Sequence, residues 1–384
     1  MLIYFIFISL FCKSIQKSDV FFTKEITPSN MVNIYKKLNI SLSGKIALKI
    51  HSGEIGGKYF LHPNFLQEIY DYINGTFVEC NTAYRSGRHT TELHKNLLKD
   101  HGWFDNNRST VIMDENPLND FNLTISNPEK ISETIVGGRL NEFDSCIVLS
   151  HLKGHSMGGF GGALKQLSIG FASQAGKTWI HTAGKTTKWE DLFTYKASQE
   201  DFTAAMGDAA SSIVEFFKKR GGIAFINVMA NISKSCDCAG GHAPKPKIKD
   251  IGILASVDPV ALDRACLDMI KKYEDIGTND WLNQVKNKLG ENTIYVAEKH
   301  GIGNQEYNLI EIGNDEDGEN VEKEEENEKN EDKTNKESGK NNNGMKIFFT
   351  IIFIIVIFGV VGYILFNKRK NYHKSFEENI EKTY

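Results

Sequence analysis

The chain has 384 residues, of which 45 are lysine or arginine and 49 are aspartate or glutamate, for a formal net charge of −4. The segment 315–340 alone contributes −7, from 12 acidic and 5 basic residues, while the tail after Phe366 adds +2 and Lys346 adds +1. Residues 1–314 are therefore formally neutral, which excludes an electrostatic case for nucleic acid as a partner.

The first residues of the chain, Met1 to Phe11, are almost wholly apolar and are followed by small or polar residues up to Ser14. A run of about ten apolar residues is too short to cross a bilayer and is typical of a secretory signal peptide. We therefore predict a signal over residues 1–14, cleaved after Ser14. A buried N-terminal strand is the alternative interpretation.

Apolar segments bounded by turn residues recur between about residues 40 and 300 and alternate with helical patterns. This alternation predicts an α/β fold with a mostly parallel sheet and helices on both faces. The predicted strands are Ile46–Ile50, Thr76–Cys80, Val111–Met113, Cys146–Ser150, Ile223–Ala230, Ile251–Ala255 and Ile294–Ala297. The predicted helices are Pro63–Ile73, Thr90–Asp100, Gly162–Gly170, Gln199–Arg220, Pro259–Tyr273 and Asp280–Leu289.

A second long apolar run, 345–366, has 22 residues and one charge at its outer edge. Its length suffices for a C-terminal transmembrane helix, and the basic residues at 368–370 indicate that the tail, 367–384, is cytoplasmic. The acidic segment 315–344 has almost no apolar residue to bury, so we predict a disordered stalk.

These segments together predict a single-pass type I membrane protein at the cell surface or in an endomembrane, with an extracytoplasmic domain over residues 15–314. Five sequons for N-linked glycan lie in that domain and none in the tail, although some sequons arise by chance. Their acceptors are Asn39, Asn74, Asn107, Asn122 and Asn231. Cys80, Cys146 and Cys266 lie in apolar segments and are interpreted as core thiols.

Polar loops follow four of the predicted strands. They are His51–Glu54, Asn81–Arg88, His151–Gly162 and Asn231–His242. Because ligands bind at the carboxyl ends of parallel strands, we expect these loops to converge on one cleft.

The most unusual segment is Lys153–Gly170, in which four glycines, Gly158, Gly159, Gly161 and Gly162, precede a predicted helix. Open backbone N–H groups and the positive end of a helix favour an anion, and Lys153 and Lys165 would complete such a site. The alternative is that the glycines only permit close backbone packing. The run Gly154–Gly158 also fits the nucleophile elbow of serine hydrolases, with Ser156 as nucleophile.

Other side chains in the loops are candidates for chemistry. His51, Glu54 and His155 suit acid–base roles, as does Asp258, although Asp258 before Pro259 first indicates a helix start. Candidate contacts for a carboxylate or phosphate are Asn81, Tyr84, Arg85 and Arg88.

A metal site is a further hypothesis. Cys236 and Cys238 flank one residue, and His242 follows four residues later, so the three side chains offer sulfur and nitrogen ligands for Zn²⁺ or iron. Two ligands within three residues are a weak pattern, and a bridge between the cysteines or two idle thiols are the alternatives.

Several of these pieces occur in a characteristic order. They are Lys49–Gly53 (KIHSG), Asn81–Arg88 (NTAYRSGR), His94 with His101-Gly102, Ser150–Lys165 (SHLKGHSMGGFGGALK), Gly176-Lys177 with His181, Cys236–Cys238, and Asp250–Asp263 (DIGILASVDPVALD). In this order they resemble the domain-of-unknown-function 362 family, over about residues 45–273. The resemblance implies an α/β domain without a settled reaction, and it makes Ser156 an accidental elbow.

Many members of that family carry a ferredoxin-like insert after the position of His181. Residues 182–219 occupy that place here and contain no cysteine, so an iron–sulfur cluster is not expected. The leading hypothesis is an enzyme-like cleft that binds a small anionic ligand, with a metal as a second candidate. The rival is a surface binding or adhesion protein that has lost the chemistry.

Overall fold

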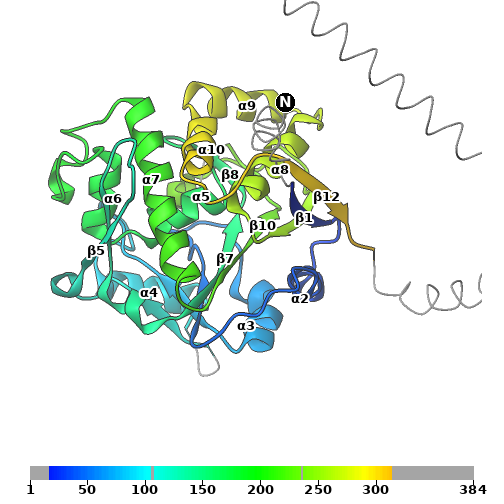
Figure 1. The fold of residues 1–384 in the computed structure, drawn as a ribbon, viewed down its shortest axis with the longest axis horizontal. Coiled ribbons are helices and arrows are strands. Elements are labelled where there is room, and N and C mark those ends of the chain that lie inside the picture. Colours follow the sequence, from blue (N-terminus) through cyan, green and yellow to red (C-terminus); the bar gives the residue numbers. More distant parts are fainter. Residues whose placement is uncertain (1–16, 105–107, 235–236, 314–384) are drawn as a thin grey trace, which may run out of the picture. The chain divides into compact units, whose positions relative to one another are not determined.

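A central sheet of eight strands organises the part of the chain that the computed structural model describes, residues 17–104, 108–234 and 237–313 (Figure 1). In spatial order its strands are β12 (Tyr307–Glu311), β1 (Ser18–Thr23), β11 (Gly252–Ser256), β10 (Ile223–Met229), β7 (Ser145–His151), β2 (Ile46–Lys49), β3 (Thr76–Glu79) and β4 (Thr110–Ile112). The α/β fold with a mostly parallel sheet is thus confirmed.

One strand runs against all the others. Strand β11 pairs antiparallel with both of its neighbours, β1 and β10, whereas the five other neighbouring pairs of the sheet are parallel. The carboxyl ends of β2, β3, β7 and β10 therefore meet at one edge of the sheet, and β11 ends at the opposite edge.

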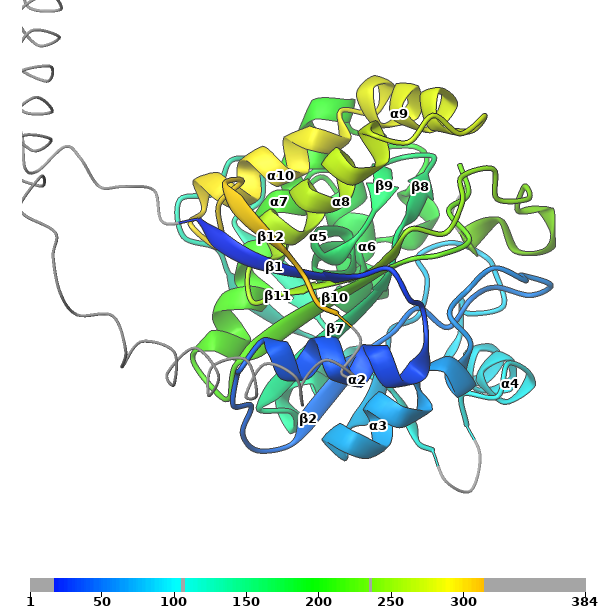
Figure 2. The ribbon, with the colours of Figure 1, turned by 90° about the vertical axis from the view of Figure 1, so that its right-hand side faces the viewer.

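Helices cover both faces of the sheet, as Figure 2 shows. On one face lie α2 (Pro28–Lys37), α3 (Gln67–Ile73) and α4 (Thr91–Asp100). On the other lie α5 (Ala163–Lys165), α7 (Gln199–Lys218) and α8 (Pro259–Lys271), with α10 (Gly290–Lys299) packed over α7 and α8. Of the remaining helices, α6 (Gln174–His181) packs against α7, and α9 (Thr278–Asn287) packs against a small hairpin.

That hairpin consists of β8 (Lys153–His155) and β9 (Gly159–Gly161), and a second antiparallel pair is formed by β5 (Phe121–Thr124) and β6 (Glu133–Val136). Strand β9 leads directly into α5, which continues as a π-helical turn over Gln166–Gly170. Such turns widen a helix locally and occur often at functional sites.

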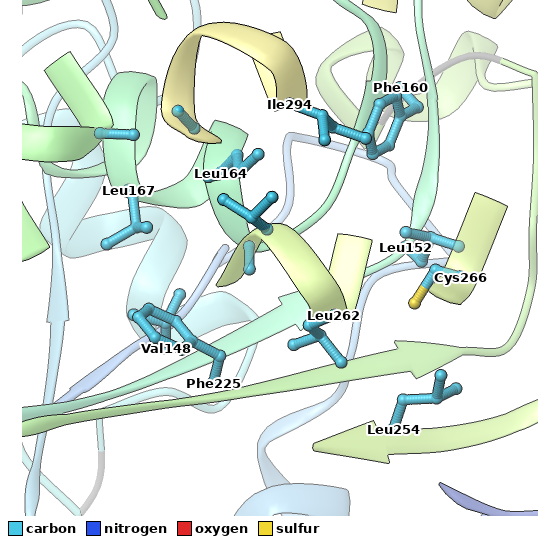
Figure 3. Close-up of a cluster of buried hydrophobic side chains, with 14 of the residues drawn as sticks. Val148, Leu152, Phe160, Leu164, Leu167, Phe225, Leu254, Leu262, Cys266 and Ile294 are labelled. Carbon is cyan, nitrogen blue, oxygen red and sulfur yellow. The ribbon is translucent and has the colours of Figure 1, made fainter. Parts of the chain in front are cut away.

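The core follows from the alternation of side chains along the buried strands. In β7, Cys146 and Val148 face the α7–α8 side, and Ile147 and Leu149 face the α2–α3 side. All four are at most 1% exposed, because a strand covered on both faces is apolar at every position. Figure 3 shows the cluster on the α7–α8 side of the sheet, in which Val148 lies among side chains from several helices.

Two features of the sheet differ from the sequence prediction. The run Ile294–Ala297 is not a strand but lies inside α10. Its buried residues, among them Ile294 and Ala297, recur at helical spacing against α7, and a short apolar run cannot distinguish the two cases. Strands β1 and β12, from the two ends of the described chain, were not predicted at all.

The predicted signal peptide, stalk, transmembrane helix and tail lie outside the described residues. Within residues 17–104, 108–234 and 237–313, no helix is both long enough and apolar enough to cross a membrane. Cys80, Cys146 and Cys266 are buried and unpaired, as predicted for core thiols.

Candidate functional site

A pocket opens at the sheet edge where β2, β3 and β7 end. Its empty volume is about 570 Å³, including open solvent at the mouth. Of the predicted site residues, it brings together His51, Tyr84, Arg88, His155 and Lys165. Other polar side chains that line it are Glu79, Thr82, Gln166, Lys177 and His181.

A buried ion network forms one wall of this pocket. The Lys49 ammonium lies 2.6 Å from one carboxylate oxygen of Glu79, and the Arg88 guanidinium lies 2.9 Å from the other. Arg88 also contacts Glu54 at 2.9 Å, and the Tyr84 hydroxyl donates to the same Glu54 oxygen at 3.4 Å. The network ties the loop after β2 to the loop after β3.

Glu79 is the centre of that network. Burial opposes ionisation of the carboxyl group, but the charges of Lys49 and Arg88 outweigh it, so the pKa of Glu79 lies well below its ordinary value. Burial alone would lower the pKa of the Arg88 guanidinium. The negative charges of Glu54 and Glu79 outweigh burial and raise that pKa above its ordinary value. Glu79 and Arg88 are therefore both charged at neutral pH.

Two histidines in the pocket have fixed and opposite tautomers. The backbone N–H of Gly158 donates to Nδ1 of His155 at 2.9 Å, so the ring proton of neutral His155 is on Nε2. The carbonyl of Lys177 can only accept, so the 2.7 Å contact with Nδ1 of His181 places that proton on Nδ1. His155 thus keeps a donor at Nε2, and His181 keeps an acceptor at Nε2.

Both imidazoles are neutral at physiological pH. Burial first, and then the positive charge of Lys165, lowers the pKa of His155 well below its ordinary value. Burial also lowers the pKa of His181 to about 4, against the raising effect of its bond to the Lys177 carbonyl.

Lys165, the last residue of α5, extends past Gly161 into the pocket. A Cβ atom at Gly161 would come within 3.3 Å of Cδ of Lys165, so the missing side chain leaves room for the lysine. The ammonium has no hydrogen-bond or ion-pair partner among the residues that the structure describes. Burial, followed by the charges of Lys153, Arg88 and Lys177, lowers its pKa to about 7.

Lys153 and Lys177 supply further positive charge. Lys153 is buried on β8 and repels Lys165, although it does not line the pocket. Lys177, on α6, donates to the carbonyl of Ala172 at 2.5 Å. Burial lowers the pKa of Lys177, and nearby Cys80 and Asp114 partly counteract that effect.

The glycine segment does not leave a helix start open to an anion, contrary to the sequence prediction. The carboxylate of Asp263 accepts from the backbone N–H groups of Ala163 and Leu164 at 2.8 and 3.0 Å. A Cβ atom at Gly162 would lie 2.3 Å from Asp263, so this glycine permits the close approach of the carboxylate. Burial raises the pKa of Asp263 to about 6.

The other glycines serve the β8–β9 hairpin. The backbone N–H of Gly158 donates to His155, and Gly159 has a φ of 81°. A Cβ atom at Gly159 would lie 3.0 Å from Cα of Gly290, so this glycine permits close backbone packing. Ser156 is exposed in the turn of this hairpin, and no histidine in the described part of the chain bonds to it. The nucleophile-elbow interpretation is therefore wrong, because an elbow needs a turn directly from strand to helix.

Asp258 lies at the other edge of the sheet, because it follows the reversed strand β11. Its side chain caps α8 by accepting from the N–H groups of Val260 and Ala261 at 2.8 and 2.9 Å. Its second oxygen accepts from Ser18 at 2.6 Å. The helix-start interpretation is correct, and the structure does not bring Asp258 to the pocket.

Two further candidates lie apart from the pocket lining. Asn81 is buried beside it, where its side-chain oxygen accepts from Nδ1 of His94 at 3.1 Å and its backbone N–H donates to Asp114. Arg85 is exposed, with its guanidinium 5.5 Å from the ring centre of Trp189. Asn81 therefore positions its neighbours, and Arg85 lies on the surface.

The metal hypothesis remains a prediction. Cys236 and the side chain of Cys238 lie outside the described part of the chain, and His242 is exposed. Among the residues that are described, no group of three or more histidine, cysteine or acidic side chains could hold a metal ion.

The sequon asparagines Asn39, Asn74, Asn122 and Asn231 are all exposed, and Asn107 lies outside the described residues. Three of them, Asn39, Asn74 and Asn231, have a positive φ near 50°. Asparagine tolerates this conformation better than most residues. The backbone conformation therefore explains an asparagine at these three positions whether or not they carry a glycan.

Three ionisable residues of the pocket, Glu79, Lys177 and His181, were not assigned a role from the sequence. Glu79 could have been noticed, since a carboxylate at the end of an otherwise apolar strand must find a buried partner. Lys177 and His181 form part of a short helix, α6, that was not predicted.

A family model confirms the family resemblance of the sequence. The model for a domain of unknown function, DUF362, matches residues 46–268, more than half of the chain. The chain belongs to the DUF362 family. No curated protein matches this DUF362 chain.

Two solved structures are similar to this DUF362 chain. One is the lactate racemase apoprotein from Thermoanaerobacterium thermosaccharolyticum, with 14% identity and a TM-score of 0.36 over 65% of this chain and 56% of that one. The other is a protein from Thermotoga maritima, with 12% identity and a TM-score of 0.35 over 71% and 58%. The chain spans less than two thirds of either structure, and similarity at this level carries no functional assignment.

Proposed function

We propose that the pocket binds a small anion, a carboxylate or phosphate, and that the protein retains an enzyme-like site for it. The observation that carries this proposal is Lys165, a cation that projects into the pocket without a partner among the described residues. A desolvated ammonium is costly unless it is paired, so an anionic ligand would relieve that cost.

The charge balance around the pocket supports the same conclusion. The cations are Lys49, Arg88, Lys153, Lys165 and Lys177, and the carboxylates that oppose them are Glu54, Glu79, Asp114 and Asp120. Five cations against four carboxylates leave an excess of one positive charge when all are ionised. A low-dielectric pocket with this excess attracts anions.

Titration calorimetry on the full chain in detergent tests the proposal, with phosphate, sulfate, oxalate and pyruvate as ligands. Lys165→Met should weaken the bound anion by roughly 10- to 100-fold, because a charge-assisted hydrogen bond is worth about 1.5–3 kcal/mol. Lys165→Arg should retain most of the affinity, and the exposed control Lys219→Met should retain all of it. Equal affinity for wild type and Lys165→Met would refute the proposal.

An inactive surface binding or adhesion protein is the rival. Such a protein needs an exposed contact surface but no half-buried ammonium that lines a pocket without a partner, so Lys165 would then be an unexplained cost. Failure of all four anions to bind would favour this rival.

We further propose that the chain is a type I membrane protein with its globular domain outside the cytosol. The proposal is supported by the apolar N-terminus, the apolar run 345–366 and the basic residues after it. Protease added to intact cells should remove the domain and leave a protected fragment ending at Tyr384. Cleavage of an epitope at that end from outside would contradict this topology.

A further inference from the structure

The amine of Lys165 differs from every other amine around the pocket in being unengaged. Lys49 pairs with Glu79, and Lys177 donates to a backbone carbonyl. Lys153 also has an interaction partner. Lys165 alone among these lysines lines the pocket without a hydrogen bond or ion pair to a described residue. A ligand that fills this pocket would therefore lie against the side chain of Lys165.

We infer that Lys165 is an imine-forming residue and that its substrates are small 2-oxo acids, which are carboxylates with an adjacent ketone. This inference rests on the anion-binding function proposed above and specifies its ligand class. Lysines serve in this way when they are desolvated or placed beside other cations.

Both of these conditions are met at Lys165. The groups that face it are Lys153 from β8, Arg88 from the loop after β3, Lys177 from α6, His155 from the hairpin and, as the opposing charge, Glu79. The cations outnumber the single carboxylate, and both burial and repulsion favour the neutral amine. With a pKa of about 7, roughly half of the Lys165 side chains carry a free lone pair at neutral pH.

The reaction balances without any further reactant. The lone pair of the amine forms a bond to the ketone carbon while the carbonyl electron pair moves to oxygen. Both protons of the neutral amine end on that oxygen, which leaves as water, and a carbon–nitrogen double bond remains. One proton from solvent then gives a cationic iminium beside the carboxylate of the ligand.

The remaining groups of the pocket suit the two ends of such a ligand. When Lys165 is neutral, the Arg88 guanidinium, which lines the pocket and has a raised pKa, still supplies positive charge for the carboxylate. The Nε2–H of His155 is a donor for the ketone oxygen, and the Nε2 of His181 is an acceptor for a proton on the leaving water. Neutral imidazoles can play these parts because neither competes as a cation.

Reductive trapping with pyruvate tests the inference. The full chain in detergent is incubated with pyruvate and cyanoborohydride at pH 7, where hydride reduces an imine to a stable secondary amine, and the modified lysine is located by peptide mass spectrometry. Modification of Lys165 should be at least about tenfold faster than that of exposed Lys219, because a pKa of about 7 leaves roughly half of the Lys165 amine neutral at pH 7.

Two controls separate this inference from the anion-binding proposal. Oxalate, which has no ketone, should bind by calorimetry and protect Lys165 from trapping, and the exposed control Lys219→Met should change neither oxalate binding nor the trapping of Lys165. If oxalate binds and Lys165 is trapped no faster than Lys219, the imine inference is wrong and the anion site stands. If phosphate, sulfate, oxalate and pyruvate all fail to bind, both proposals are wrong, and if only phosphate or sulfate binds, the imine inference alone is wrong.

Discussion

The substitution Glu79→Gln removes the central charge of the buried network. Glu79 is 3% exposed and separates two cations, Lys49 at 2.6 Å and Arg88 at 2.9 Å. Glutamine fills nearly the same space, so the change leaves Lys49 without its ion-pair partner and Arg88 with Glu54 alone. Removing one partner from a buried ion pair costs about 3–5 kcal/mol, because the remaining charge stays desolvated.

Thermal unfolding of the full chain in detergent, followed by near-ultraviolet circular dichroism, measures this cost. At roughly 2 °C per kcal/mol for a domain of this size, Glu79→Gln should lower Tm by roughly 6–10 °C. The matched control is Glu215→Gln, which breaks an exposed pair with Lys219 at 3.0 Å and should change stability by at most about 0.5 kcal/mol. Equal effects of the two substitutions would refute the account of the network.

Lys165→Met should raise the free energy of unfolding near neutral pH, because it removes an ammonium that the pocket destabilises. The pKa of Lys165 falls from 10.5 to about 7, and at about 1.4 kcal/mol for each unit the gain is at most about 5 kcal/mol. Because the pKa of Lys165 is lower in the folded state, wild-type stability should rise between pH 7 and 10.5. The difference in unfolding free energy between Lys165→Met and wild type should therefore shrink over this range, and a constant difference would argue against a perturbed amine. Gly162→Ala should destabilise the fold by about 1–3 kcal/mol in chemical denaturation, since its Cβ would meet Asp263 at 2.3 Å, and an unchanged midpoint would contradict this packing. A fluorophosphonate probe should not label exposed Ser156, and labelling that Ser156→Ala abolishes would restore the hydrolase interpretation.

The sequence was informative where a physical rule connects residue type to position. Apolar runs of the right length identified β2, β3, β7 and β10 closely, and their parallel arrangement predicted that the loops after them converge. The pocket is lined by residues from the loops after β2, β3 and β7, among them His51, Tyr84 and His155, whereas no described residue of the loop after β10 lines it.

The remaining errors come from partners far along the chain. The helix start after Gly162 is predicted to bind an anion from local sequence, but Asp263, about 100 residues later, supplies the anion itself. Asp258 was expected near the pocket because the direction of β11 is not encoded in its own residues. Burial of Glu79 between Lys49 and Arg88 likewise depends on two separate strands and a loop.

The most direct test of the anion site is the uptake of protons when oxalate binds, measured at pH 8 by calorimetry in two buffers of different ionisation enthalpy. With a pKa near 7, Lys165 is roughly 90% neutral at pH 8, so pairing with an anion should draw close to one proton per site from the buffer. Lys165→Arg, which is always charged, should bind oxalate with no comparable uptake. The same proton uptake in wild type and Lys165→Arg, or none in either, would contradict the assignment of Lys165 as the cation that meets the ligand.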